Sequence, residues 1–177
     1  GFLIRGVEPV ESIGEHVFST TVMAAMLVEE VRLSGYEVDG EKLLKMAILH
    51  ESGEILVGDI PNPSSIFMGK EVKQRVELAA GRAALTGFPD LQAIVEEFEL
   101  GMSLESRLIR SIDKLQMLIK VMIYESQGKV GLEEFWHFAG NIRKLDIPII
   151  DTLFDEIRRL RGKVHLDFFG MLPETDG

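Results

Sequence analysis

The chain has no cysteine among its 177 residues. Disulfides, thiolate metal sites and cysteine nucleophiles are therefore excluded, and this composition fits a reducing cytosol, so we expect a cytoplasmic protein. The chain also has no apolar run that approaches the ~20 residues of a membrane span, and no signal-peptide pattern opens it. We therefore expect no membrane partner.

Basic residues are scarce, with 19 Lys and Arg against 29 Asp and Glu, a net charge of −10. Binding to a nucleic-acid polymer depends on basic patches that neutralise phosphates, so this class of partner is excluded. A small anionic substrate stays possible, because a metal ion and a few basic groups can reverse the field within one cleft. The length suits one domain with a real core and is too short for two.

No convincing strand pattern occurs, and the apolar residues follow helical spacing nearly throughout. Ser12 followed by Glu15 has the form of a capping box, and Ser103 stands at another helix start. Glycines and prolines between 53 and 63 predict a loop, and the tail after Gly162 has no clear period. We expect one all-α domain over residues 1–177, with helices near 13–35, 39–51, 69–86, 90–100, 104–124, 132–145 and 148–161.

Four polar residues in predicted helices stand next to apolar neighbours: His16, the adjacent pair His50 and Glu51, and Asp113. Two imidazoles and two carboxylates suit one divalent first-row transition metal, such as Mn, Co, Zn, Fe or Ni. His50 and Glu51 point about 100° apart on a helix, so both reach one ion only beyond the helix end. The following Ser52-Gly53 loop gives that freedom.

Plainer interpretations of each residue stay open. A lone buried histidine is more often hydrogen-bonded than metal-bound, and Asp113 could pair with Lys114 or Arg110. Glu54 could be an exposed loop carboxylate, or it could stand beside an ion and accept a proton from water. The acids Glu96, Glu97 and Glu99 are expected on a solvent-exposed helix face.

The stretch 50–61, which runs from His50-Glu51 through Glu54 to Gly58-Asp59-Ile60-Pro61, resembles the HD-domain phosphohydrolases. It is similar to the branch that contains 5′-deoxynucleotidases, where His-Asp-x-x-Glu precedes Gly-Asp-hydrophobic-Pro. Residues 5–16 resemble the first motif of that branch, and residues 111–115 resemble its last. Order and spacing agree over about residues 3–125, which leaves about 130–177 for further helices and a tail.

The resemblance implies an HD-type helical fold and hydrolysis of (deoxy)nucleoside 5′-monophosphates. It implies that His16, His50, Glu51 and Asp113 hold the metal, that Glu54 is the acid–base or water-positioning residue, and that Asp59 orients the sugar. The resemblance also suggests a homodimer, because members of the family commonly form dimers. For the phosphate, the candidates on the chain are Arg5, Lys70 and Lys73, although each is more simply explained as a surface charge.

The chain departs from the family pattern at Glu51, where the family has aspartate. This departure keeps open a catalytically weak nucleotide-binding protein with a structural metal. A nucleotide pyrophosphohydrolase or a cyclic phosphodiesterase also stays open, because the same ion can serve either reaction. Two-metal enzymes usually need further histidine ligands, and the chain has only four histidines, which favours one metal.

Overall fold

The computed structural model describes residues 1–61, 63–140 and 147–163, and its regular elements there are all helical. The expected all-α class is confirmed. In chain order the elements are η1 (Leu3–Arg5), α1 (Ile13–Leu33), α2 (Gly40–Leu49), α3 (Glu54–Val57), α4 (Ser64–Met68), α5 (Lys70–Ala84), α6 (Pro89–Leu100), α7 (Leu104–Ser126), α8 (Glu133–Gly140) and α9 (Pro148–Leu160).

Side-chain caps set where the two longest helices begin. The Ser12 hydroxyl accepts a hydrogen bond from the Glu15 amide, and the Glu15 carboxylate accepts one from the Ser12 amide. Ser103 and Ser106 form the same reciprocal pair at the start of α7. Each cap contributes about 1 kcal/mol and fixes the rotational phase of the helix that follows. The predicted capping box and N-cap are therefore both confirmed.

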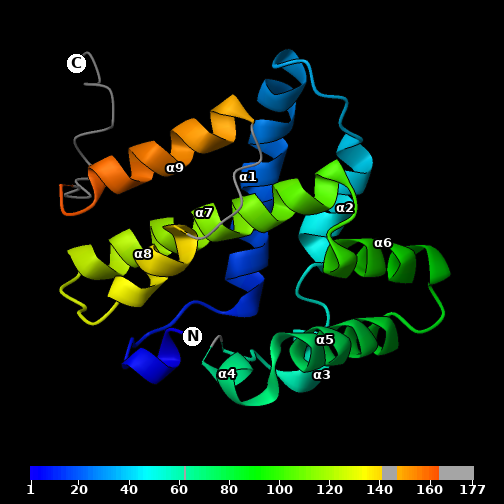
Figure 1. Ribbon diagram of the computed structural model, residues 1–177, viewed down its shortest axis with the longest axis horizontal. Coiled ribbons are helices and arrows are strands. Elements are labelled where there is room, and N and C mark those ends of the chain that lie inside the picture. Colours follow the sequence, from blue (N-terminus) through cyan, green and yellow to red (C-terminus); the bar gives the residue numbers. More distant parts are fainter. Residues whose placement is uncertain (62, 141–146, 164–177) are drawn as a thin grey trace, which may run out of the picture.

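Helix α7 runs through the middle of the molecule, with α1, α2 and α6 against its first half and α8 and α9 along its second (Figure 1). Its apolar face is almost completely removed from solvent, and full burial of one such side chain contributes about 1.5–3 kcal/mol. This packing fixes the positions of α1 and α2 relative to α7. The buried residues of α7 include Leu108, Ile112, Leu115, Leu118 and Val121, each at most 1% exposed.

The segment between α2 and α5 is more structured than expected. The predicted loop over residues 53–63 contains the short helix α3, which ends at Gly58 with φ of 71°. A second short helix, α4, follows before α5. A Pro- and Gly-rich composition predicts chain reversal, but it does not exclude single helical turns between the reversals. The expected helix over 132–145 is present as α8 up to Gly140, and its remainder lies outside the described residues, as does most of the expected tail.

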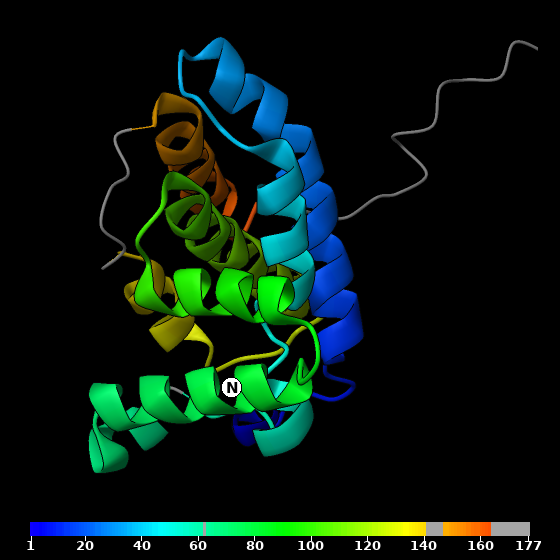
Figure 2. The ribbon, with the colours of Figure 1, turned by 90° about the vertical axis from the view of Figure 1, so that its right-hand side faces the viewer.

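Helix α5 forms a layer beneath α6 and packs against α3 (Figure 2). Two glycines permit this close approach. A Cβ atom on Gly53 would lie 2.8 Å from the Glu77 carbonyl oxygen, and one on Gly81 would lie 2.7 Å from Val95 Cγ1. The turn that follows His50 is therefore held directly against α5.

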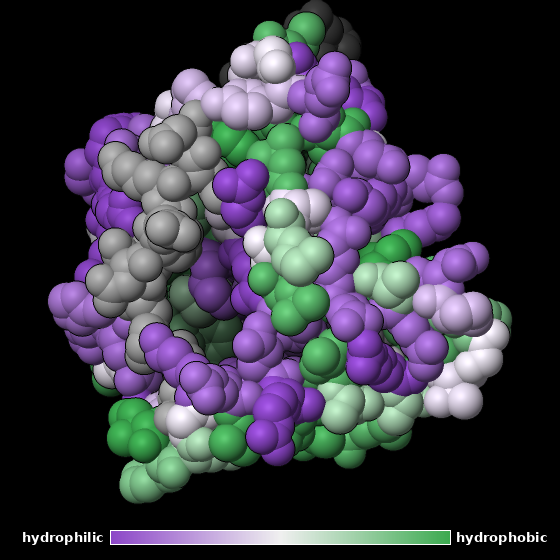
Figure 3. Space-filling model, turned by 45° about the vertical axis from the view of Figure 1, so that its right-hand side comes forward, coloured by the Kyte–Doolittle hydropathy of each residue, from purple (hydrophilic) through white to green (hydrophobic). Residues whose placement is uncertain are grey.

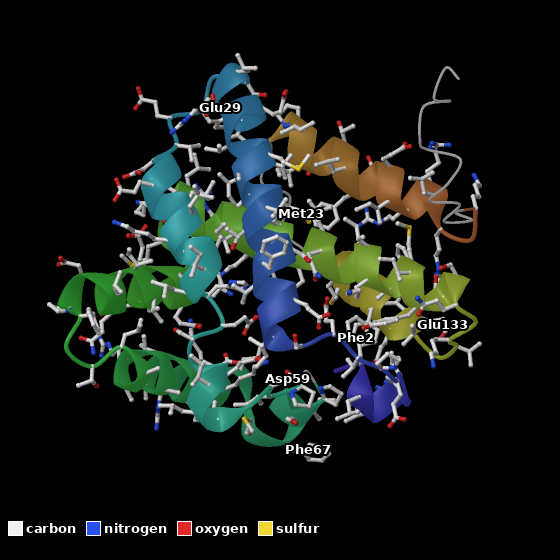
Figure 4. All side chains as sticks on the ribbon, turned by 180° about the vertical axis from the view of Figure 1, so that it is seen from behind. Phe2, Met23, Glu29, Asp59, Phe67 and Glu133 are labelled. Carbon is white, nitrogen blue, oxygen red and sulfur yellow. The ribbon has the colours of Figure 1, made fainter. Side chains whose placement is uncertain are left out.

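The face of the molecule seen in Figure 3 mixes hydrophilic and hydrophobic residues, and several hydrophobic ones lie along its lower edge. Exposed hydrophobic side chains of α3 and α4 belong to this end of the molecule, among them Ile55 (73% exposed) and Phe67 (91%), and Phe67 points outward (Figure 4). No helix in the described ranges is long and apolar enough to cross a membrane. The homodimer and the cytoplasmic location stay predictions.

We expect Gly53→Ala to lower the free energy of unfolding by about 1–3 kcal/mol, because backbone at Glu77 blocks the new methyl group. Gly14→Ala is the matched control, since its Cβ would meet only the Ser12 hydroxyl at 3.9 Å. That control should leave stability unchanged or raise it by up to about 1 kcal/mol. Urea unfolding of both variants measures the difference, and equal stabilities would contradict the close approach.

Candidate metal centre and pocket

Three segments far apart in the chain bring four ligand-type side chains together. His16 comes from the second turn of α1, His50 and Glu51 follow the end of α2, and Asp113 comes from the middle of α7. One ligand atom from each of these four lies within 4.8 Å of all the others. The four residues proposed from the sequence therefore meet at a single point.

The spacings within this cluster are those of groups that share one partner. His16 Nε2 lies 3.3 Å from His50 Nε2 and 3.4 Å from Asp113 Oδ1. Glu51 Oε1 lies 3.8 Å from His16 Nε2 and 3.6 Å from His50 Nε2. Glu51 therefore brings a carboxylate oxygen to the cluster, although the family pattern has aspartate here.

Hydrogen bonds on the far side of each imidazole indicate which nitrogen carries the proton. His50 Nδ1 donates to the Ala47 carbonyl oxygen at 2.8 Å, and His16 Nδ1 lies 2.8 Å from Gln116 Oε1. Nε2 is then the nitrogen of each ring that faces the two carboxylates. Two carboxylates that converge on two Nε2 atoms attract positive charge, either a proton on His16 or a divalent metal, so the donor set fits a metal ion.

The titration behaviour of the cluster agrees with this fit. Burial alone would lower the pKa of His16, but the carboxylates of Asp113, Glu11 and Glu51 raise it to about 10. Burial lowers the pKa of His50 to about 4, which keeps that imidazole neutral, as a metal ligand must be. The acids therefore create a field that favours positive charge at this point.

Asp113 is buried in α7, and burial by itself would raise the pKa of its carboxyl. The charges of Lys114 and the hydrogen bond and charge of His16 outweigh burial, so the pKa of Asp113 lies well below its usual range. Its carboxylate is therefore ionised over the whole neutral range. Ionised oxygen is the form that binds a divalent cation.

Glu54 stands beside the cluster as the first residue of α3. Burial, followed by the charges of Glu51 and Asp59, raises the pKa of Glu54 to about 8. A carboxyl with a pKa near neutrality can both hold and release a proton. Glu54 therefore has the chemistry of an acid–base group placed next to the metal cluster.

The cluster lies in a cavity of about 480 Å³, a size typical of sites for small organic ligands. Its lining combines the four ligand-type residues with Glu54 and with several apolar side chains. Such a lining can hold a charged group at one end and a flat or apolar group at the other. The apolar lining residues include Phe2, Ile4, Ile13, Met117 and Phe135.

Asp59 also lines this cavity, beyond the end of α3. It lies below the first turn of α1, between α1 and the α3–α4 segment (Figure 4). Its side chain is half exposed, and its carboxylate accepts a hydrogen bond from the amino group of Gly1. The position is compatible with contact to a ligand, and its assignment to the sugar stays a prediction.

The three candidate phosphate contacts lie in different places. Arg5 forms an ion pair with Glu134, and neither Arg5 nor the exposed Lys70 lines the cavity. Lys73 does line it, and its ammonium group donates to the Ile60 carbonyl oxygen at 2.7 Å. Of the three, only Lys73 is placed where a ligand in the cavity could meet it.

Sequence reasoning missed two cations on α7 that do line the cavity. Lys114 Nζ lies 2.7 Å from Asp113 Oδ2, and Arg110 donates to the Phe98 carbonyl oxygen at 2.8 Å and covers the Phe98 ring. Arg110 is three residues before Asp113, which places both on one helix face. In the sequence, this spacing indicates only that Arg110 and Lys114 are possible partners for Asp113.

Glu99 corrects an expectation, because it is only 9% exposed and lines the cavity instead of a solvated face. Burial raises its pKa to about 7, Arg110 at 3.8 Å opposes the rise, and Glu77 adds to it. The charged neighbours Glu96 and Glu97 suggested an exposed helix face. Packing of α6 over α5 and α7 decides which member of the run is buried.

We expect Glu99→Gln to stabilise the protein increasingly as the pH rises. The folded state holds the Glu99 proton up to about pH 7, whereas the unfolded state releases it near its usual pKa of 4.5. Ionisation therefore costs folding free energy between these values, and the cost reaches at most about 3 kcal/mol above pH 7. Melting temperatures between pH 5 and 8 measure the gain, with exposed Glu37→Gln as the control. A gain that is constant over this pH range would contradict the burial argument.

Comparison with known proteins gives the family. A family model described as HD domain matches residues 1–152. The chain is 30% identical to 5′-deoxynucleotidase HDDC2 of Danio rerio over 171 residues, which cover 92% of this chain and 80% of the relative. The human 5′-deoxynucleotidase HDDC2 is 28% identical over 169 residues, with 92% and 78% covered.

Two solved structures have the same architecture. A conserved hypothetical protein from Pyrococcus furiosus superposes with a TM-score of 0.80 at 33% identity, and 90% of each chain is covered. The PH0347 protein from Pyrococcus horikoshii gives a TM-score of 0.79 at 31% identity, again with 90% of each chain covered. The chain therefore belongs to the HD domain family, within the part of it that is similar to 5′-deoxynucleotidases.

Proposed function

We propose that the protein is a metal-dependent phosphohydrolase that cleaves the phosphate monoester of (deoxy)nucleoside 5′-monophosphates. The observation that carries this proposal is the convergence of His16, His50, Glu51 and Asp113 within 4.8 Å, beside Glu54, in a ligand-sized cavity. The names of relatives at about 30% identity support the substrate class. Glu51 in place of aspartate still offers oxygen at the same point.

In this proposal the four residues hold one divalent transition metal, such as Mn, Co, Zn, Fe or Ni. Such an ion, when bound, lowers the pKa of a coordinated water and polarises a phosphoryl oxygen. His50 stays neutral through burial, and Asp113 stays ionised through Lys114 and His16. Two carboxylates beside a dication leave the centre near neutral, so a phosphate group is not repelled.

In the proposed reaction, Glu54 transfers a proton from the attacking water to the leaving group. Hydrolysis joins a water oxygen to phosphorus and breaks the bond from phosphorus to the 5′ oxygen of the nucleoside. The Glu54 carboxylate takes the proton that the water loses and returns it to the departing 5′ oxygen. Its partly buried position beside Glu51 supports this role, since a raised pKa allows the carboxyl to carry a proton near pH 7.

The remaining cavity residues position the substrate. Lys114 and Arg110 supply positive charge to the phosphate oxygens from one face of α7. Asp59 lines the cavity just after α3 and accepts a hydrogen bond from a sugar hydroxyl. Apolar walls that include Ile13 and Met117 cover the nucleoside and limit access of bulk water.

The test is phosphate release from deoxynucleoside and ribonucleoside 5′-monophosphates by protein loaded with Mn, Co, Zn, Fe or Ni. Turnover should require metal and should stop when a chelator removes it. Asp113→Asn should lower kcat/KM by at least about 100-fold, because a neutral amide replaces an ionised ligand. Asp90→Asn, an exposed change on α6, should have no effect.

No phosphate release with any of these metals, or equal activity in Asp113→Asn, would refute the proposal. Nucleoside triphosphates and cyclic nucleotides belong in the same panel. Preference for one of them would instead indicate a pyrophosphohydrolase or a cyclic phosphodiesterase that uses the same metal.

We expect Lys114→Met to raise KM for a nucleoside monophosphate by about 10–100-fold while metal content stays at the wild-type level. Loss of one charge-assisted hydrogen bond to phosphate costs about 1.5–3 kcal/mol. Lys45→Met is the control, because Lys45 pairs with Glu41 on the exposed side of α2. An unchanged KM for Lys114→Met would remove this residue from phosphate binding.

A further inference from the structure

A chain of hydrogen bonds runs outward from His16, on the side away from the metal cluster. His16 Nδ1 lies 2.8 Å from Gln116 Oε1, and Gln116 Nε2 lies 3.0 Å from Glu11 Oε2. Lys120 Nζ lies 3.1 Å from the same Glu11 oxygen. Gln116 is 4% exposed, and the Glu11 side chain is 7% exposed, so the chain is shielded from water.

Donor and acceptor chemistry allows only one arrangement of this chain. An ionised carboxylate only accepts hydrogen bonds, and Lys120 only donates. The ammonium group of Lys120 lies 3.1 Å from Glu11 Oε2 and needs an acceptor, so Glu11 acts as a carboxylate that only accepts. Gln116 must therefore direct its NH₂ group toward Glu11.

The orientation of the amide decides the state of the histidine. With its NH₂ group committed to Glu11, Gln116 presents its carbonyl oxygen Oε1 to His16. That oxygen accepts, so His16 Nδ1 must carry a hydrogen and donate it. In the neutral ring that a metal requires, His16 Nε2 is then the nitrogen with the lone pair, and it faces Asp113 Oδ1 and Glu51 Oε1 at 3.4 and 3.8 Å.

We propose that Gln116, oriented by Glu11, is a positioning residue that fixes His16 in the tautomer able to bind a metal through Nε2. The inference rests on the metal site of the proposed function and is independent of which bond the enzyme hydrolyses. Helix α7 thus contributes Asp113 as a ligand and, one turn later, the support of a second ligand. Hydrogen-bonded supports of this kind typically contribute 10–100-fold to metal affinity.

A purely structural role for Gln116 makes a different prediction. If Gln116 only fills space between α1 and α7, an apolar side chain of the same length should replace it without loss of metal binding. If it acts through its oxygen, a glutamate should replace it, provided that Glu11→Gln restores an NH₂ donor opposite the new carboxylate, and a methionine should not replace it. The methionine variant and this exchange of Glu11 and Gln116 keep nearly the same lengths and separate these roles.

The experiment measures the dissociation constant for Zn²⁺ by competition with a chromogenic chelator, for wild type, Gln116→Met, the double variant Glu11→Gln with Gln116→Glu, and Gln127→Met. The last is the matched control, an exposed glutamine at the end of α7. We expect about 10–100-fold weaker binding for Gln116→Met. Binding by the double variant should stay within about threefold of wild type, because residue 116 still accepts from Nδ1 and residue 11 supplies the NH₂ group that faces it. Gln127→Met should match wild type. Wild-type affinity in Gln116→Met, or equal losses in Gln116→Met and the double variant, would overturn the inference.

A second measurement on the unaltered chain decides the matter if Gln116→Met does not fold. Nitrogen-15 spectra of the histidine-labelled, zinc-loaded protein distinguish metal-bound Nε2 from metal-bound Nδ1, and only four histidines contribute signals. Coordination of His16 through Nε2 with a proton on Nδ1 is the expected result. Coordination through Nδ1 would overturn the inference. Metal binding with this pattern but without nucleotide hydrolysis would contradict the proposed function alone.

Discussion

The main constraint on this structure is that two histidines and two carboxylates meet at one point, which favours positive charge there. Two imidazole nitrogens and two carboxylate oxygens lie within 4.8 Å of one another, in a partly buried cavity where water screens them poorly. The raised pKa of His16 reflects this preference, because the surrounding carboxylates hold a positive charge there. A divalent cation satisfies all four groups together, which links the chemistry of the site to the packing that brings the groups together.

Helix α7 carries both parts of this arrangement. Its apolar face, with Leu108, Ile112 and Leu115 at most 1% exposed, forms the centre of the core. A neighbouring face carries Asp113 and Gln116, which both contact His16 of α1. The close packing of the buried face therefore fixes where these polar side chains lie.

Several features of the site were predictable because they depend on local chemistry. The capping box at Ser12 and the N-cap at Ser103 set helix starts that the structure confirms. The meeting of His16, His50, Glu51 and Asp113 was inferred because polar groups among apolar neighbours need a partner. Glu99 was misjudged, since a run of acids looks the same in sequence whether one member is buried or none is.

By itself, the sequence determined the helical class, most helix ends and the ligand chemistry of a mixed nitrogen and oxygen site. These follow from side-chain type and from spacing within one helix, which act over a few residues. Only the tertiary structure decided which cations line the cavity, why Arg5 does not, and which nitrogen of His16 faces Asp113. Those outcomes depend on contacts between segments about 100 residues apart, such as His16 with Gln116, and they are set by how the helices pack around α7.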